Sequence, residues 1–579
     1  MASDVSGSAA ATDGGLPFQY PPGADPTRYS YPDDWPWPQV PTNGNPAKMA
    51  PEVIRIPKPE LDDWKKYLFT YYEDNFLPYA DEAARYCAEA LKKKSPNAQQ
   101  TTELAVCAWA ALSGSLSEGE WKRDFDTFFR DFDEPSGSYA PLDDKLFTDE
   151  MGHGLLSKLL SRLDKPDQKT FAAVLSKLPG RMFYKSDSTH MRVVRNPDAG
   201  EYVAPSVTLF SAPETNDGGD LQLRVEAIAL FGQPGPGQPY DTRGQLFTPA
   251  DGAAWDLAKY FAMQGALVRI NLVDHPMVHF PSDSINAITK AALPTDNFLL
   301  QLLWPHFRLS LPVDNSVLEG SYSLLNRTYF YPYAPYPAKG GEMRQVFPFY
   351  WTGANAPPDD DPFWTGRPNA FPAYKFALEP RNVPSRYGNF LGAFYEPILQ
   401  FTKQVVAQIP PHQKADIAQW ATYIASWVPG FPMAEDVADS STLARTLAAI
   451  IWNAAIVHSA DHFLMHAMFE GKLPLPYVIR NPPPMNGNPG GPAQVDASDV
   501  FSARLCDQLF FMPHNTETLL DCRYRFTDGV LIGAADQFRI DLAELGESLH
   551  KRYPEFQIRV RGDTPVERER RVFAAGLQY

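Results

Sequence analysis

Two apolar stretches that each carry a histidine pair decide the fold: residues 255–279 read WDLAKYFAMQGALVRINLVDHPMVH, and residues 450–462 read IIWNAAIVHSADH. His275 and His279 are four residues apart, as are His458 and His462. Four residues are close to one helical turn, so each pair projects from one side of its helix. We therefore predict two core helices that cross and bring four imidazoles to one metal ion.

The number of such pairs exceeds what composition alone predicts. With 11 histidines among 579 residues, chance placement gives about 0.2 pairs at a spacing of four. Three pairs occur, because His466 also follows His462 by four residues. A single histidine is more often a hydrogen-bonded structural residue than a metal ligand. Two pairs on apolar helices instead favour metal binding.

Two further histidines keep a structural interpretation. His306 follows a proline and precedes Phe307, so we interpret it as a packing residue or as a hydrogen-bond partner of a ligand. His466 lies one turn beyond His462 and could face solvent or substrate. Neither histidine is predicted to bind the metal directly.

The residues around the pairs narrow the choice of metal. None of the four cysteines lies near either pair, which argues against zinc-thiolate and iron–sulfur sites. The stretch HPMVH at 275–279 lacks the glutamate of the metalloprotease motif HExxH. Only residues 547–550 (ESLH) match the Glu-x-x-His unit of carboxylate-bridged di-iron sites. Several neutral imidazoles suit a single redox-active iron, and manganese stays open because geometry and availability decide between the two.

Composition excludes several classes of partner. Lysine and arginine number 52 against 69 aspartates and glutamates, and the net charge of −17 repels nucleic acid. The N-terminus has no basic start followed by an apolar run, and no window holds 18 uninterrupted apolar residues, so we expect neither a signal peptide nor a transmembrane segment. Four cysteines without CxxC spacing suit a reduced cytoplasm. We expect a cytoplasmic monomer.

The pattern along the chain predicts a mainly α fold. Residues 1–50 form a flexible Pro-rich arm, and residues 51–579 form a single helical domain. Alternating apolar and polar residues predict a small antiparallel β region at about 202–231. Helices are expected at about 392–407, 414–427, 441–468 and 538–552. Pro276 removes a backbone donor, so we expect a kink or a widened turn between His275 and His279.

The order and spacing of several motifs resemble those of the lipoxygenases. The matching stretches are residues 255–259 (WDLAK), the first histidine pair, residues 302–308 (LLWPHFR), and residues 450–458 (IIWNAAIVH), which include Trp452. His275, His279 and His458 stand where this family has its first three metal ligands, and His462 stands where it has a fourth, Asn or His. The resemblance spans roughly residues 205–490.

This resemblance implies a lipoxygenase-like catalytic domain that holds a non-haem iron. It implies insertion of O2 into a polyunsaturated fatty acid, or a related unsaturated substrate, after hydrogen abstraction, to give a hydroperoxide. The C-terminal carboxylate, here that of Tyr579, would be the last metal ligand. Val317 and Leu318 stand where the family places residues that steer oxygen. No catalytic residue beyond the metal centre is implied.

The sequence also departs from the family pattern. Lipoxygenases space their first pair five apart, whereas here the spacing is four, with Pro276 between the histidines, and the family's C-terminal ligand is an isoleucine. The N-terminal lipid-binding β-barrel of plant and animal members is not recognised here, as in several bacterial members. Two alternatives therefore remain open: a metal oxygenase that acts on a non-lipid unsaturated metabolite, and a non-catalytic relic or binding protein.

Overall fold

The computed structural model of the chain describes most of its C-terminal three quarters. The described residues are 137–139, 142–214, 219–307, 385–425, 430–469, 476–495, 517–556, 558–560 and 572–577, with a few single residues between these ranges. Three predictions lie outside them: the Pro-rich arm of residues 1–50, the oxygen-steering pair Val317 and Leu318, and the ligand Tyr579.

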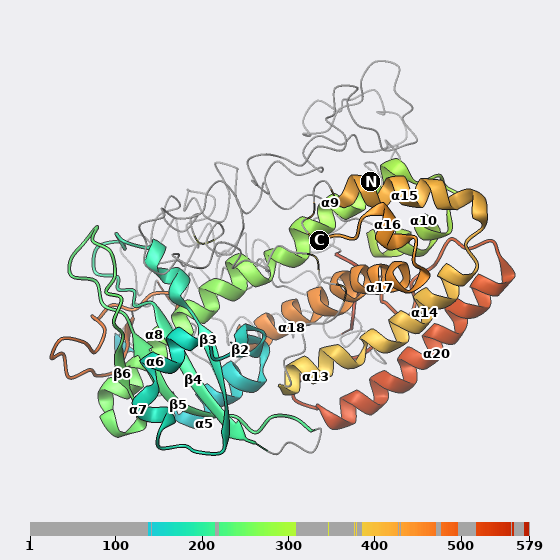
Figure 1. Cartoon of the computed structure of the whole chain (residues 1–579). Coiled ribbons are helices and arrows are strands. Elements are labelled where there is room, and N and C mark those ends of the chain that lie inside the picture. The colour runs from blue at the N-terminus through green and yellow to red at the C-terminus, as the bar shows by residue number, and fades with distance from the viewer. Residues whose placement is uncertain are drawn as a thin grey trace, which may run out of the picture.

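A five-stranded antiparallel sheet forms one end of the described molecule (Figure 1). Its strands follow one another in both sequence and space: β2 (Leu160–Arg162), β3 (Arg181–Asp187), β4 (Ser206–Pro213), β5 (Arg224–Leu230) and β6 (Gln245–Phe247). The predicted antiparallel region is confirmed, but the sheet is larger than the 202–231 segment. The flanking strands β2 and β6 have only three residues each, too few to show the alternation on which the prediction rested.

Both faces of the sheet are covered because its central strands are apolar on both sides. In β4, Val207 and Leu209 face a small cluster beneath the short helices α6 (Lys165–Thr170) and α7 (Ala172–Leu175). Phe210 belongs instead to the main core, which the period of two along a strand requires. Helix α8 (Ala253–Arg269) packs against β4 and β5 and joins the sheet to the helical part.

A long helical axis starts at the sheet and crosses the molecule (Figure 1). It consists of α8, a π-helical turn η8 (Ile270–Asp274) and α9 (Pro276–Ala292). Helix α8 lacks the polar stripe of a surface helix, and all its residues from Leu257 to Arg269 are buried. A helix that is apolar around most of its circumference belongs inside a core.

A second axis of the same kind lies beside the first. It consists of α17 (Ser440–Ile451), a π-helical turn η14 (Trp452–Val457) and α18 (His458–Phe469). Helix α9 contacts η14, so the two axes meet where their histidines lie. Helix α14 (Tyr395–Ala407) packs against α17 on one side and against α20 (Gly529–Arg552) on the other (Figure 1).

The predicted mainly α fold with a small antiparallel sheet is confirmed. The remaining described helical segments are α5 (Asp144–Thr148), η4 (Asp149–His153), η5 (Leu155–Leu159), η6 (Thr189–Val193), η7 (Pro249–Asp251), α10 (Phe298–Leu303), η9 (Trp304–Phe307), α13 (Arg386–Ala393), η13 (Pro411–Gln413), α15 (Lys414–Ala425) and α16 (Ala434–Val437). A separate two-stranded pair joins β1 (Gly137–Ser138) to β7 (Gln494–Val495).

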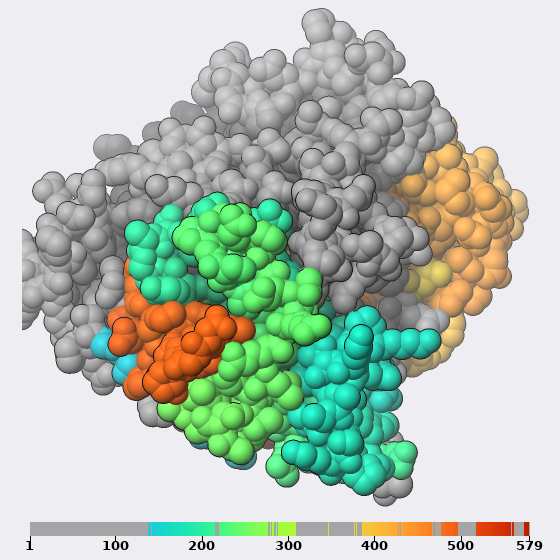
Figure 2. All heavy atoms as spheres, turned by 60° about the vertical axis from the view of Figure 1, so that its left-hand side comes forward, coloured from blue at the N-terminus to red at the C-terminus, as the bar shows by residue number. Residues whose placement is uncertain are grey.

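The segment 481–495 packs on the outside of the sheet end, where Figure 2 shows it in orange against the green residues. Gly490 lies so close to the start of α8 that an added Cβ would be 2.7 Å from backbone atoms of Ala253 and Ala254. Its φ of 80° also favours glycine. Close backbone approach therefore fixes this segment on the N-terminal end of α8.

One described helical run, Ser440–Met465, has the length and hydropathy of a membrane-spanning helix, with a mean hydropathy of 1.2. However, 83% of its apolar window is buried inside the protein. A buried core helix passes the same composition test as a membrane span. Its apolar character is accounted for by the histidine-bearing core that it forms.

Candidate metal centre

Each histidine pair begins where a π-helical turn ends. The His275 N–H donates to the Ile270 carbonyl at 2.9 Å, five residues back, and the His458 N–H donates to the carbonyl of Asn453 in the same register. A π turn inserts one residue into the helical repeat and so rotates every later side chain around the axis. Both helices therefore change their facing direction at the first histidine of the pair.

The predicted widening lies before the first pair, not between its histidines. We expected Pro276 to disturb the helix between His275 and His279, but the widened turn η8 ends at Asp274. Pro276 is instead the first residue of α9. Proline is well placed there because its fixed φ suits the helix and its missing N–H is not needed in a first turn. The prediction was thus wrong in position, since the hydrogen-bond register changes one turn earlier.

A buried ion pair spans the π turn η8. Arg269 Nε lies 2.9 Å from Asp274 Oδ2, and the two side chains are 9% and 4% exposed. Arg269 also donates from Nη1 to the Asp187 carbonyl at the end of β3, at 3.0 Å. The two ends of the widened turn are therefore tied to each other and to the sheet immediately before His275.

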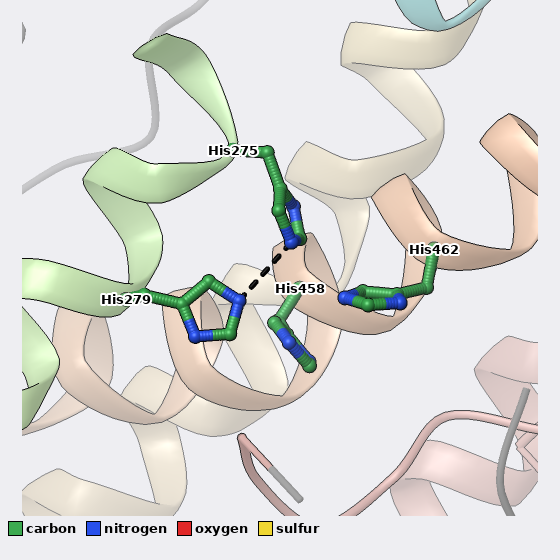
Figure 3. Close-up of side chains that lie close together, drawn as sticks. All are labelled: His275, His279, His458 and His462. Atoms are coloured by element: carbon green, nitrogen blue, oxygen red, sulfur yellow. Dashed lines mark hydrogen bonds between the residues drawn. The ribbon is translucent and has the colours of Figure 1, made fainter. Parts of the chain in front are cut away.

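The structure brings the four predicted histidines together (Figure 3). Each offers one ring nitrogen to a group in which all these atoms lie within 4.8 Å of one another. The Nε2 atoms of His275 and His279 are 3.1 Å apart. Ring centroids of His458 and His462 are 4.4 Å apart, and those of His279 and His458 are 4.6 Å apart. The spacing of four within each pair thus has the geometric result that the sequence predicted.

Burial keeps the imidazoles in the form that binds metals. All four histidines are between 4% and 7% exposed. Burial lowers the pKa of His275 below its ordinary value, although the hydrogen bond to Asp461 opposes the shift. Burial and the neighbouring His275 together hold the pKa of His279 well below 6.5. The His275 and His279 rings are therefore neutral at physiological pH, and a neutral ring nitrogen is a metal ligand.

The arrangement fits a single transition-metal ion. An imidazole nitrogen binds zinc, for example, at about 2.0–2.1 Å. Two such bonds that meet at an angle of about 90° to 110° place their nitrogens about 2.8–3.4 Å apart. The 3.1 Å between the Nε2 atoms of His275 and His279 lies in that range. Four nitrogen donors without a thiolate suit iron or manganese better than a structural zinc site.

His306 lies in the core but does not join the four histidines. Its Nδ1 is 2.5 Å from the Ala575 carbonyl oxygen, and its Nε2 is 3.4 Å from the Tyr524 hydroxyl. The ring is fully buried, and burial lowers its pKa to about 4. His306 therefore holds the C-terminal segment 572–577, which agrees with the structural interpretation taken from the sequence.

The C-terminal segment also reaches the second histidine helix. The Ala574 N–H donates to the hydroxyl of Ser459 at 3.0 Å, and Ser459 is the neighbour of His458. The segment thus contacts the residue next to His458 at Ala574, five residues before Tyr579. The predicted ligand Tyr579 itself lies outside the described residues.

Two other residues named from the sequence are placed as follows. Trp452 begins the π turn η14, and its indole Nε1 donates to the Leu391 carbonyl on α13 at 2.8 Å. It therefore anchors the widened turn. Among the described hydrogen bonds, none joins Trp452 to one of the four histidines. His466 lies on α18, and its side chain is outside the described residues.

Three polar residues near the site were missed. Buried Asp461 and Tyr387 and half-buried Lys158 form a hydrogen-bonded group that touches His275 through Asp461. Asp461 alone carried a signal, because a charged residue within an apolar helix needs a partner. Lys158 and Tyr387 lie 303 and 74 residues away from it in the chain, so no local pattern could have linked them.

Comparison with solved structures identifies the fold as that of the lipoxygenases. A coral 8R-lipoxygenase matches with a TM-score of 0.57 and 15% identity, covering 95% of this chain and 79% of that chain. A calcium-dependent 11R-lipoxygenase matches with a TM-score of 0.54 and 15% identity, covering 76% of this chain and 66% of that chain. A LOX variant in complex with arachidonate matches with a TM-score of 0.55 and 17% identity, covering 83% and 75%.

Comparisons by sequence find no such relative. No protein-family model matches the chain, and no curated protein matches it. The identities of 15–18% to the solved structures show the fold alone. The fold class expected from the motif resemblance is therefore confirmed.

Proposed function

We propose that this protein is a non-haem iron dioxygenase that inserts O2 into a polyunsaturated fatty acid or a related unsaturated substrate. One observation carries the proposal: four buried imidazoles converge from two π-widened core helices within a lipoxygenase fold. His275, His279, His458 and His462 would hold the metal. Manganese is the alternative ion, because the same donors bind both.

The proposed reaction adds both oxygen atoms to the substrate. A C–H bond of a doubly activated CH2 breaks, a C–O bond forms, and the hydrogen ends on the outer oxygen of the hydroperoxide, so no external reductant is consumed. Iron bound by the histidines would supply the one-electron redox chemistry for this hydrogen abstraction. A CH2 flanked by two double bonds is the preferred target because its radical is delocalised.

The chain itself would supply an enclosed and fixed set of donors. The histidines are nearly fully buried among apolar core residues, so water has little access to the site. Their helices are locked by the Arg269–Asp274 pair on one side and by the Trp452–Leu391 hydrogen bond on the other. Fixed donors need no reorganisation when a substrate binds.

The first test measures the metal content of the protein. Iron, manganese and zinc are counted per polypeptide in the purified wild type and in His458→Ala, with His412→Ala as the control because His412 lies on the separate segment η13. We expect near-stoichiometric iron or manganese that is lost only in His458→Ala. An ion-free wild type, or zinc that is indifferent to the substitution, would contradict the proposal and favour a non-catalytic protein.

The second test measures oxygen uptake with linoleate and with arachidonate. Arachidonate is included because one protein of the same fold was solved in complex with it. We expect uptake that requires the metal and yields a hydroperoxide with conjugated double bonds. Uptake only with non-lipid unsaturated compounds would keep the oxygenase and replace its substrate class.

A further inference from the structure

Asp461 is a fully buried carboxylate on α18, between the two histidines of the second pair. Its Oδ2 lies 3.4 Å from His275 Nδ1 on the neighbouring axis and 2.5 Å from Lys158 Nζ on η5. Its Oδ1 accepts the hydroxyl of Tyr387 on α13 at 3.1 Å. A carboxylate has about four acceptor positions, and three are used by groups from three different elements.

The Asp461 carboxylate is charge-paired and held by partners on three elements. Its Oδ2 pairs with the Lys158 ammonium, which can only donate and which supplies the countercharge that a buried carboxylate needs. The three partners come from separate parts of the chain, so the Asp461 side chain has one position that satisfies all of them. The Lys158 side chain is 18% exposed, whereas that of Asp461 is 1% exposed.

This contact decides which nitrogen of His275 carries the proton. A carboxylate paired with the Lys158 ammonium has only acceptor positions, so Nδ1 of His275 is the N–H donor. In the neutral ring the other nitrogen, Nε2, then has the free lone pair. That atom is the one that lies 3.1 Å from His279 Nε2 inside the histidine group. The proton on Nδ1 therefore leaves the inward nitrogen ready to bind a metal.

We propose that Asp461 is a positioning residue of the metal centre, which fixes the tautomer and orientation of His275 and offsets part of the ion's charge. Metal-bound histidines commonly donate their second N–H to a carboxylate, and loss of that partner weakens metal binding about 10–100-fold. Tyr387 holds the carboxylate through its other oxygen, and Lys158 partly neutralises its charge. The inference rests on the proposed metal site and adds the residue that makes one of its ligands competent.

A purely structural role gives a different pattern of effects. If the Asp461–Lys158 pair only stabilises the fold, removing either partner should harm the site in the same way. If Asp461 acts on the metal through its charge, removing Lys158 leaves that charge less neutralised, and the site should attract a cation as strongly as before or more strongly. The two interpretations thus predict opposite signs for a Lys158 substitution.

The test measures Co²⁺ affinity of the metal-free protein by visible absorption in competition with a chelator. We expect Asp461→Asn to weaken Co²⁺ binding about 10–100-fold and Lys158→Met to leave it unchanged or strengthen it. Asp499→Asn is the matched control, because Asp499 is also a buried carboxylate paired with an arginine, Arg480, 2.6 Å away. It should cost stability without changing Co²⁺ affinity.

The melting temperature of each metal-free variant shows whether it folds. If Asp461→Asn does not fold, the direction of the change in Co²⁺ affinity of Lys158→Met distinguishes the two interpretations. Co²⁺ affinity of Asp461→Asn within twofold of wild type would overturn the inference. So would a Lys158→Met protein that binds Co²⁺ as weakly as Asp461→Asn. A wild type that takes up no Co²⁺ would instead overturn the metal centre itself, so the two failures are distinguishable.

Discussion

Gly576 packs directly against the backbone of His306. The substitution Gly576→Ala therefore tests how the C-terminal segment is held against η9. An added Cβ would lie 2.6 Å from the carbonyl carbon of His306 and 2.9 Å from its Cα, besides a closer contact with its carbonyl oxygen. All three are backbone atoms of a fully buried residue, so no side chain can move aside. We expect the substitution to push segment 572–577 away from η9.

The size of the effect follows from the contacts at stake. Overpacking a well-packed core costs about 1–3 kcal/mol. A local shift away from η9 that keeps the backbone bonds to Arg559, Glu517 and Leu519 would instead lose the bonds from His306 to Ala575 and from Ala574 to Ser459, each worth about 0.5–1.5 kcal/mol. Both routes give about 2 kcal/mol. Local opening of the segment should therefore become about 30-fold more frequent.

Hydrogen exchange of residues 572–577 measures this opening directly. Co²⁺ affinity should fall as well, because Ser459 neighbours His458 and loses its partner. Gly533→Ala is the control: Gly533 lies in α20 with nothing within 4 Å of an added Cβ, so alanine should stabilise the helix by about 0.5–1 kcal/mol. Wild-type exchange in segment 572–577 of the Gly576→Ala protein would refute this description of the packing.

Two further predictions concern charge and pH. Acidification from pH 6.5 to 4 should lower the melting temperature, because burial lowers the pKa of His306 from 6.5 to about 4. In this pH range the folded state binds fewer protons than the unfolded state. The stability that is present above pH 6.5 is therefore lost as the pH falls, by about 3 kcal/mol at pH 4. His306→Gln should show a shallower fall, and an equally steep one would count against the assignment. Asp274→Asn should cost about 3–5 kcal/mol because it leaves Arg269 buried without its charge partner and should weaken Co²⁺ binding through the η8 turn. Its control, Asp536→Asn, removes an acid whose side chain is 66% exposed and should change neither quantity, whereas equal melting temperatures for the two variants would contradict the role of the buried pair.

The sequence determined the features that depend on local spacing. Intervals of four residues and continuous apolar runs predicted two buried helices with two histidines each. The helical segments at 395–407, 414–425 and 440–469 lie close to the predicted ranges, whereas the last helix begins at residue 529, nine residues before the predicted start. These features repeat within a turn or two of helix, so a short window contains all the information. The same windows also placed the alternating strands β4 and β5, but they missed the seven-residue strand β3 and the three-residue strands β2 and β6.

The tertiary structure decided everything that joins distant parts of the chain. The His275–Asp461 contact spans 186 residues, and the His306–Ala575 contact spans 269. No periodicity indicates that a given carboxylate or carbonyl will meet a given ring, because such contacts arise only when separate helices pack. The π turns belong to this class too: Pro276 indicated a disturbance, but the register shifts before it, where Arg269 and Asp274 pair inside the core. The local sequence thus predicted the four imidazoles, and the packing of separate helices determined their direction, protonation and neighbours.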